Sequence, residues 1–167
     1  EALGAGEALE APFPLHRGEG VLVAETGVGK VAAALAVAHV LTRFRPSESF
    51  FLGVAGALDP SLRALDLLLA EKAALALGLP CRRGVVATGD RFLAQRAEAE
   101  RLRALHGADA VEMEGAAALM VAWRFRHPMA LRRVVTDGAG EGAALDFQAF
   151  LREAARRLGL LARALVE

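Results

Sequence analysis

The sequence predicts an α/β fold with a mostly parallel central sheet that is covered by helices on both faces. Short β-prone runs alternate along the chain with longer segments of helical spacing. Of the 167 residues, 54% are hydrophobic, which is enough for one sizeable core. We therefore expect a single domain over residues 1–167.

Each expected strand is a short apolar run, and each expected helix has apolar residues at helical spacing. The strands are expected at residues 20–24, 49–54, 65–70, 83–88, 108–111 and 131–136. The helices are expected at residues 31–44, 93–105, 115–124 and 147–165, with Pro46 ending the first of them. Residues 1–18 are rich in Gly and Pro and are expected to form a loop.

The composition restricts the classes of partner. Basic and acidic residues balance at 20 each, without a basic block or an aromatic-studded patch, so we expect neither nucleic acid nor a membrane. A small molecule or a second copy of the chain is expected instead. The single cysteine, Cys81, excludes an intramolecular disulfide framework and favours a reducing compartment, by default the cytoplasm. No apolar run reaches transmembrane length, and the first residues lack a signal-peptide pattern.

The stretch Asp109-Ala-Val-Glu-Met-Glu-Gly-Ala-Ala117 carries the strongest chemical signal. A β-prone run gives way there to a small-residue helix, so Glu112 and Glu114 lie where a strand passes into a helix. Ligands bind at such strand ends in open α/β sheets. On an extended backbone both carboxylates would lie on one face, with Met113 on the other, an arrangement suited to gripping a diol. Alternatively, the acidic residues only complement the helix dipole.

A glycine-rich turn precedes the first expected helix. The segment Glu25-Thr-Gly-Val-Gly-Lys30 resembles a phosphate-binding loop, but that motif needs Gly six residues before the lysine and Ser or Thr directly after it. Ala24 and Val31 occupy those positions, so the magnesium-binding hydroxyl is missing. We therefore expect a glycine turn that opens a helix and could hold an anion, rather than nucleotide triphosphate hydrolysis.

Further groups are expected at the same edge of the sheet. The segment Gly53-Val-Ala-Gly-Ala57 has a bare backbone that either accommodates a flat ligand or packs closely against a helix. Asp90 and Phe92 follow one expected strand, and Asp137 follows another, where Asp-Gly alone would indicate a turn. Phe92 is either a stacking platform or an ordinary core aromatic. Carboxylates, an aromatic ring and a bare backbone on one edge together predict a binding site.

Five motifs occur in a particular order along the chain. They are Gly27-Val-Gly-Lys-Val-Ala-Ala-Ala34, Gly53-Val-Ala-Gly56, Thr88-Gly-Asp-Arg-Phe92, Val111-Glu-Met-Glu-Gly-Ala116 and Val135-Thr-Asp137. Their order and context resemble the nucleoside phosphorylase and nucleosidase superfamily, most closely its methylthioadenosine/S-adenosylhomocysteine nucleosidase branch. The resemblance extends over nearly all of the chain from Val21 onward. It implies a three-layer αβα domain with a mostly parallel, partly mixed sheet.

The resemblance also implies roles for individual side chains. Asp137 would be the acid at the purine N7, and Glu114 would hold the ribose hydroxyls. Glu1 would be the glutamate that activates water, or lie just past it. Met113 would pack under the sugar, and Phe92 would stack on the purine. The residues implied to bind the substrate are Glu112, Met113, Phe92, Leu93 through its backbone, Val54, Ala55 and Gly56.

The chain departs from the family pattern in three places. The leading β-strand of the family, which ends in the water-activating glutamate, is absent, so that base is unassigned. The stretch between Leu69 and Ala76 is shorter than the corresponding family segment, which indicates that residues are missing near Ala73. Val54 stands where the nucleosidases carry a small polar residue, as in the futalosine hydrolase branch, whereas Asp137 matches adenine-specific members.

These residue types suit the cleavage of a bond between ribose carbon and purine nitrogen. The reaction passes through an oxocarbenium-like state, so an acid at the departing base and a carboxylate at the sugar both lower the barrier. We expect hydrolysis of a 5′-modified purine nucleoside, 5′-methylthioadenosine or S-adenosylhomocysteine, by a homodimer. The alternatives are a futalosine hydrolase, a purine nucleoside phosphorylase and an inactive nucleoside-binding module. No metal or cofactor is expected, since the four histidines are scattered singly.

Overall fold

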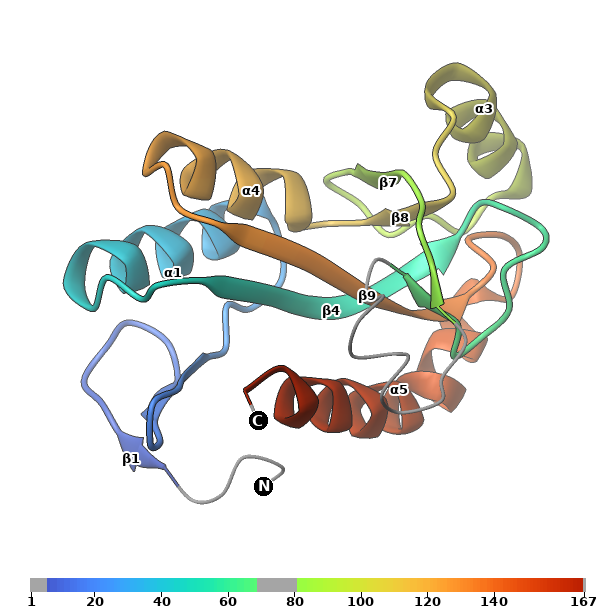
Figure 1. The fold of residues 1–167 in the computed structure, drawn as a ribbon. Helices are drawn as coiled ribbons and strands as arrows, with labels where there is room; N and C mark the ends of the chain where they lie inside the picture. The colour runs from blue at the N-terminus through green and yellow to red at the C-terminus, as the bar shows by residue number, and fades with distance from the viewer. Residues whose placement is uncertain (1–5, 69–80, 167) are drawn as a thin grey trace.

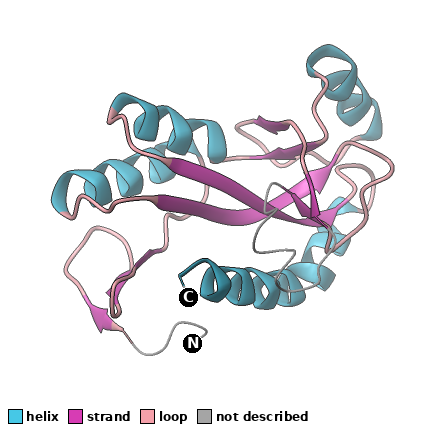
Figure 2. Cartoon of the chain, viewed as in Figure 1, coloured by secondary structure: helices cyan, strands magenta, loops and turns pink. Residues whose placement is uncertain are grey.

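The computed structural model describes residues 6–68 and 81–166 (Figure 1). Within these ranges a six-stranded sheet forms the middle layer of three, as the colouring by secondary structure in Figure 2 shows. Helices α1 (Lys30–Arg43) and α4 (Gly115–Arg124) lie side by side on one face of the sheet, and α5 (Ala143–Val166) covers the other. This arrangement confirms the predicted three-layer αβα architecture.

The sheet has the strand order β6-β5-β9-β4-β8-β7. Its long central strands, β4 (Ser49–Ala57) and β9 (Met129–Asp137), run parallel to each other. The short strands are β5 (Leu67–Leu68), β6 (Cys81–Arg82), β7 (Val86–Thr88) and β8 (Ala110–Glu112). The β5–β6 and β7–β8 pairs are parallel, whereas β5–β9 and β4–β8 are antiparallel, so the sheet is mixed.

The antiparallel β8 decides where the carboxylates of the central motif lie. Gly56 pairs with Val111 and Ala57 pairs with Ala110, so the carboxyl end of β8 points back toward the middle of β4. The prediction that all strand ends gather at one carboxyl-end edge is therefore wrong for Glu112 and the residues after it. It is also wrong for Asp90 and Phe92, which follow β7, because β7 runs parallel to β8. Apolar spacing predicts that a strand exists but does not encode its direction, and a long connection permits either one.

A small antiparallel sheet of β1 (Glu7–Ala8), β2 (Leu15–Arg17) and β3 (Leu22–Ala24) precedes α1. The prediction of a loop over residues 1–18 is thus wrong for the described part, because its Gly and Pro residues belong to the turns of this sheet. Gly20 has a φ of 70°, a conformation that favours glycine, in the turn between β2 and β3. The strand expected at 20–24 pairs only with β2 and is partly exposed rather than buried.

Apolar side chains hold the helices on the sheet. The α1 and α4 layer packs through Ala33, Val37, Leu41, Phe51, Ala118, Ala122 and Leu131. The alanines in this cluster let the two helices approach each other and the sheet closely. On the opposite face α5 packs through Leu67, Val134, Ala154 and Leu161.

Several element boundaries differ from those predicted. Strands β4 and β9 extend to Ala57 and Asp137, so the bare segment at 53–57 is itself part of a strand. Helix α3 (Arg96–His106) begins later than expected, and α5 begins earlier. Of the strand expected at 65–70, the structure describes Leu67–Leu68; the segment around Ala73 lies outside the described residues.

Candidate active site

Asp137 ends β9 at an irregularity in the central strand pair. It is buried, with 5% of its surface exposed. Ala55 pairs with Val135 and Gly56 pairs with Asp137, so Thr136 is an extra residue in β9. A bulge of this kind re-aims the side chains beside it.

The Asp137 carboxyl is held by two neighbouring donors. The backbone N–H of Ala139 donates to Oδ1 at 2.9 Å, and the Thr136 hydroxyl donates to Oδ2 at 3.0 Å. Burial raises the pKa of Asp137; these hydrogen bonds oppose the increase, and the nearby charge of Asp146 adds to it. Asp137 therefore keeps its proton to a higher pH than an exposed aspartate, as a general acid requires.

Gly56 makes room for this carboxyl. A Cβ atom at position 56 would lie 2.7 Å from Oδ1 of Asp137 and 3.1 Å from the Cβ of Ala139. Any larger residue would displace the acid. At this position the bare backbone of β4 makes room for the side chain at the end of β9, and not for the helix of the packing alternative.

Glu114 is the N-cap residue of α4, but its side chain does not cap its own helix. Its Oε1 instead accepts a hydrogen bond of 2.7 Å from the backbone N–H of Gly29, at the start of α1. Its Oε2 accepts no hydrogen bond from the described residues. One carboxylate oxygen is thus fixed to the protein, and the other is available for hydroxyl groups.

Glu112 is turned inward and surrounded by protein donors. Its side chain is 1% exposed, and its Oε2 pairs with Nη2 of Arg133 at 2.7 Å. The same oxygen accepts hydrogen bonds from the backbone N–H groups of Glu114 at 3.1 Å and Gly115 at 2.7 Å, and Oε1 accepts one from the Thr88 hydroxyl. The pair of carboxylates expected on one face is therefore not formed, because β8 ends at Glu112 and the chain bends at Met113 and Glu114.

These donors reverse the effect of burial on Glu112. Burial alone would raise its pKa, but the charge of Arg133 and the hydrogen bonds from Thr88, Arg133 and Gly115 hold the pKa below its ordinary value. Glu112 is consequently ionised at neutral pH. It orients the start of α4 and the backbone of Glu114 through its hydrogen bonds.

Arg133 reaches Glu112 by crossing β4. It is the register partner of Gly53, and a Cβ atom at position 53 would lie 3.1 Å from Nη1 and 3.2 Å from Cζ of Arg133. Nη1 donates to the Phe51 carbonyl at 3.0 Å, and the guanidinium carbon lies 5.0 Å from the centre of the Phe51 ring. Both glycines of the bare segment thus leave room for side chains of β9, Gly53 for Arg133 and Gly56 for Asp137.

The end of β7 and the residues after it connect the start of α4 with the start of α1. The Thr88 hydroxyl accepts a hydrogen bond of 2.9 Å from the Ala116 N–H while donating to Glu112. Two residues further along, Oδ2 of Asp90 lies 2.8 Å from Nζ of Lys30, the first residue of α1. The motifs at 27–34, 88–92 and 111–116 therefore meet around Glu114.

Phe92 lies at the surface rather than in the core. Its side chain is an exposed large hydrophobic, at 45%, and its ring meets Phe147 edge to face with centroids 5.8 Å apart. This exposure favours the stacking-platform alternative. Leu93 is buried in a cluster with Leu58 and Ala139, so its side chain lies in the core close to Asp137.

The side chains of two small residues of β4 pack in apolar clusters. Ala55 is 3% exposed and packs in a cluster with Leu68 and Val135. Val54 packs against the cluster beneath α5. Met113 is partly buried between the two glutamates.

Glu1 lies outside the described residues, so its suggested role stays a prediction. Within residues 6–68 and 81–166, no three His, Cys, Asp or Glu side chains gather as a metal site. No helix in the described part of the chain is both long and apolar enough to cross a membrane.

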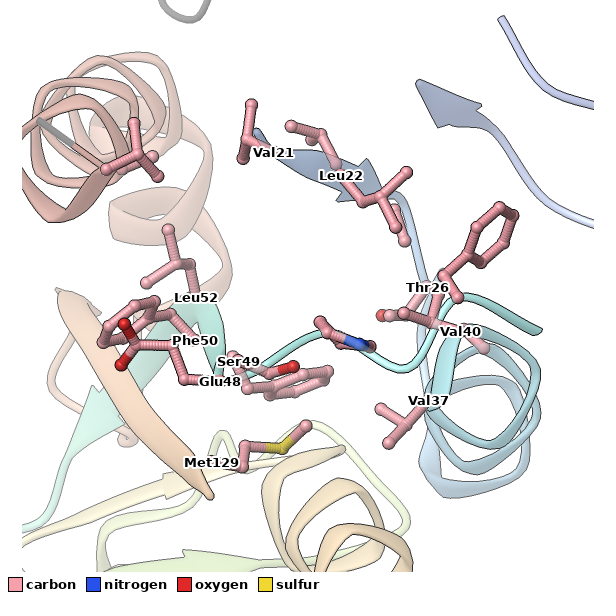
Figure 3. Close-up of a pocket in the computed structure, with 18 of the residues that line it drawn as sticks. Val21, Leu22, Thr26, Val37, Val40, Glu48, Ser49, Phe50, Leu52 and Met129 are labelled. Carbon is pink, nitrogen blue, oxygen red and sulfur yellow. The ribbon is translucent and has the colours of Figure 1, made fainter. Parts of the chain in front are cut away.

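A cavity of ≈ 890 Å³ lies away from these carboxylates, between β3, β4, α1 and the end of α5. In Figure 3, Val21 and Leu22 face Phe50 and Leu52 across it. Only its end near Thr26 approaches the glycine turn before α1. Among the described strands, β8 pairs only with the last two residues of β4. The rest of that edge is unpaired within the described residues, and residues 49–52 of β4 line the cavity.

Sequence reasoning did not identify the three residues that hold the two glutamates in place. Arg133, Thr88 and Gly29 hold Glu112 and Glu114 in place. The available signal was indirect: a glycine at position 53, in a β-prone run, indicates that a neighbouring side chain approaches the backbone. The identity of that side chain depends on the strand register, which the sequence does not give.

Proteins of known name resemble this chain in sequence and fold. An aminodeoxyfutalosine nucleosidase of Campylobacter jejuni is 28% identical over 181 residues, covering 86% of this chain and 79% of the relative. A 5′-methylthioadenosine/S-adenosylhomocysteine nucleosidase of Staphylococcus aureus is 28% identical over 173 residues, covering 81% and 76%. A mutant of the Helicobacter pylori enzyme of that name, solved with 5′-methylthioadenosine in its active site, superposes with a TM-score of 0.90 at 26% identity, covering 97% of this chain and 88% of that one.

A family model also matches most of the chain. The model of the phosphorylase superfamily matches residues 10–74 and 67–167, which include every motif around Glu114 and Asp137. The fold, the order of the motifs and the match over both segments lead to one conclusion. The chain belongs to the phosphorylase superfamily.

Proposed function

We propose that this protein hydrolyses the N-glycosidic bond of a 5′-modified purine nucleoside, 5′-methylthioadenosine or S-adenosylhomocysteine, and releases the free purine base and a ribose derivative. The buried Asp137 carboxyl carries the proposal, because burial raises its pKa and Gly56 leaves it room beside β4. Relatives named as nucleosidases of these substrates support it.

The proposed reaction breaks the bond between C1′ of the ribose and the purine nitrogen. The bonding electron pair leaves with the base, and Asp137 gives its proton to N7. The oxygen of water bonds to C1′ while the water-activating base takes one of its protons. Positive charge grows on the sugar meanwhile. The Glu114 carboxylate, with Oε1 fixed by Gly29, accepts hydrogen bonds from the ribose hydroxyls through Oε2, and these strengthen in the transition state.

The remaining residues shape the binding site. Phe92 stacks on the purine, the Leu93 backbone lies at its edge, and Met113 packs under the sugar. The segment Val54-Ala-Gly56 contributes its backbone, since the Val54 and Ala55 side chains pack into the core. We assign Glu112 an indirect part in substrate binding, because its oxygens already accept hydrogen bonds from four protein groups.

The base that activates water is the open assignment. Glu1 is our candidate, and it lies outside the described residues. We also propose that a further strand of the fold fits the cavity between β3 and β4, where an unpaired edge of β4 borders an apolar gap. The overlap of the two family-model segments at residues 67–74 supports the proposal that residues are missing near Ala73.

Futalosine-type nucleosides are the second candidate substrates. A relative from Campylobacter jejuni is named aminodeoxyfutalosine nucleosidase, and Val54 resembles the futalosine hydrolase pattern. The same acid and carboxylate would cleave the same kind of bond. Only the group on the 5′ carbon differs, so the two candidates differ in specificity and share the chemistry.

The local charges favour water over phosphate as the acceptor. Arg133 is buried against Glu112, and Arg91 pairs with Glu98. Lys30 is bound to Asp90. These basic groups are neutralised by protein carboxylates, whereas a phosphorylase needs cationic groups for its phosphate.

A second copy of the chain is the proposed partner, in the cytoplasm. The outer surfaces of α1 and α4 expose large apolar side chains: Val31 at 85%, Leu35 at 53%, Met120 at 66% and Trp123 at 72%. Large apolar side chains exposed on two neighbouring helices are typical of an interface. Trp123→Glu should convert a dimer to a monomer in analytical ultracentrifugation; a parent that sediments as a monomer contradicts this proposal.

One experiment tests the reaction and separates its alternatives. The protein is incubated with 5′-methylthioadenosine, S-adenosylhomocysteine or aminodeoxyfutalosine, with and without phosphate, and free base is measured by chromatography. Base release that does not depend on phosphate supports a hydrolase, and release that requires phosphate indicates a phosphorylase. Binding without release in any arm indicates the inactive module. Asp137→Asn should abolish most release, and Asp66→Asn, on an exposed turn, is the matched control.

A further inference from the structure

The glycine turn before α1 resembles a phosphate-binding loop but holds protein carboxylates. Its Gly29 N–H donates to Oε1 of Glu114 at 2.7 Å, across 85 positions of sequence. Its Lys30 ammonium lies 2.8 Å from Oδ2 of Asp90. The two groups that a phosphate would contact are therefore both engaged by acidic side chains of the chain itself.

Backbone conformation, not space, explains the glycine at position 29. Gly29 has a φ of 97°, and a Cβ atom there would meet nothing within 4 Å. An L-residue fits the space but is strained in this conformation. The positive φ directs the Gly29 N–H toward Glu114 at the point where the chain enters α1.

Helix α1 supplies no anion for its own N-terminus. Its first turn contains no acidic residue, and its N-cap makes no side-chain hydrogen bond. The partial positive charge of that end is met instead by Glu114 from the start of α4. A charge-assisted hydrogen bond to a fixed backbone group is short and directional, so it restricts the carboxylate to one orientation.

We propose that the N-terminal turn of α1 is the positioning element of Glu114, with Gly29 as its positioning residue. It fixes Oε1, so that Oε2 alone meets the ribose hydroxyls in one geometry. The Lys30–Asp90 pair links this turn to the segment that carries Phe92, so the sugar and base contacts share one support. This inference rests on the proposed function, because it assigns the fixed carboxylate to the sugar.

The test compares Gly29→Ala with Gly20→Ala. Gly20 also has a positive φ, of 70°, and open space at its Cβ, so alanine there strains the backbone far from Glu114. The substrates are 5′-methylthioadenosine and its 2′,3′-dideoxy counterpart, which has no hydroxyls for Glu114 to hold. Gly29→Ala should lower kcat/KM for 5′-methylthioadenosine by roughly 10- to 100-fold, the range for a misplaced positioning group.

The decisive readout is the preference for 5′-methylthioadenosine over its dideoxy counterpart, because a general loss of protein stability lowers activity on both substrates alike. The ratio of the two kcat/KM values should fall about tenfold or more in Gly29→Ala and stay at the parental value in Gly20→Ala. An unchanged ratio in Gly29→Ala, or an equal fall in both variants, overturns the inference.

A second readout does not depend on activity. If the parent releases no base from any nucleoside, the proposed function fails, and amide NMR then decides the positioning contact alone. The Gly29 amide proton should shift upfield in Glu114→Ala, because it loses its charged acceptor, while the Gly20 amide proton stays in place. A Gly29 resonance that does not move overturns the contact.

Discussion

Replacing Glu112 by glutamine should destabilise the protein by about 3–5 kcal/mol, the usual cost of leaving one partner of a buried ion pair uncompensated. Both side chains of the Glu112–Arg133 pair are 1% exposed. The amide keeps the shape of the carboxylate but removes its charge. Arg133 would then stay charged and buried, with only carbonyl oxygens to accept its hydrogen bonds.

The loss of unfolding free energy in Glu112→Gln should lie toward the lower end of this range. Arg133 retains the carbonyls of Phe51 and Arg132 as acceptors, and the glutamine oxygen can still accept from Gly115. The measurement is urea unfolding at pH 7, followed by circular dichroism, for Glu112→Gln, Arg133→Met and the double variant. The double variant should lose less free energy of unfolding than the two single variants added together, because it leaves no unpaired charge.

The pH dependence has a defined sign. The folded-state pKa of Glu112 is lowered from its ordinary value of 4.5, so its contribution is present above that pH and is lost as the pH falls through the folded-state pKa. The difference in unfolding free energy between parent and Glu112→Gln should therefore narrow below pH 4.5. A loss under about 1 kcal/mol at pH 7, as for an exposed pair, would refute the reasoning.

The remaining predictions concern catalysis. Asp137→Asn should lower turnover of adenine nucleosides by about 10²- to 10⁴-fold and affect an activated aryl riboside less; an equal loss on both would make Asp137 structural. Asp146→Asn removes a charge that raises the pKa of Asp137, so the basic limb of the pH–rate profile should move to lower pH, and an unmoved limb would contradict the acid assignment. Glu114→Gln should cost about 2–4 kcal/mol of transition-state stabilisation without unfolding, and near-parental turnover would exclude it from the sugar site. Phe92→Ala should raise KM more than it lowers kcat, whereas an unchanged KM would leave Phe92 only its contact with Phe147.

The layers and the main motifs were predictable because they depend on local pattern. Alternating apolar runs and helical spacing are enough to predict strands, helices and their stacking in three layers. The passage from strand to helix at Glu114 and the strand end at Asp137 follow from residue type and spacing alone. Glu114 is the N-cap of α4, between the end of β8 and the helix as expected, and Asp137 is the last residue of β9.

The inward turn of Glu112 was not predictable, because it depends on non-local geometry. Its role requires that Arg133 is opposite Gly53 in register and that β8 runs antiparallel to β4. Neither the register nor the direction of a three-residue strand is encoded in its own sequence. Strands β1 and β2 before α1 were missed for a related reason: a strand of two or three residues is too short to show an alternation of apolar and polar side chains.

Two of the buried carboxyl groups near β4, Asp137 and Glu112, differ in their surroundings, and this difference separates their roles. Burial raises the pKa of Asp137 although hydrogen bonds oppose the increase, and the nearby charge of Asp146 adds to it. Glu112 is buried against a guanidinium, so its pKa is lowered. When two carboxyl groups have pKa values shifted in opposite directions, the group with the raised pKa is the one suited to donate a proton, and the other stays ionised at neutral pH. Asp137 can therefore supply a proton to a departing base, whereas Glu112 cannot, and its place in the central motif is explained by the support that it gives to the backbone of Glu114.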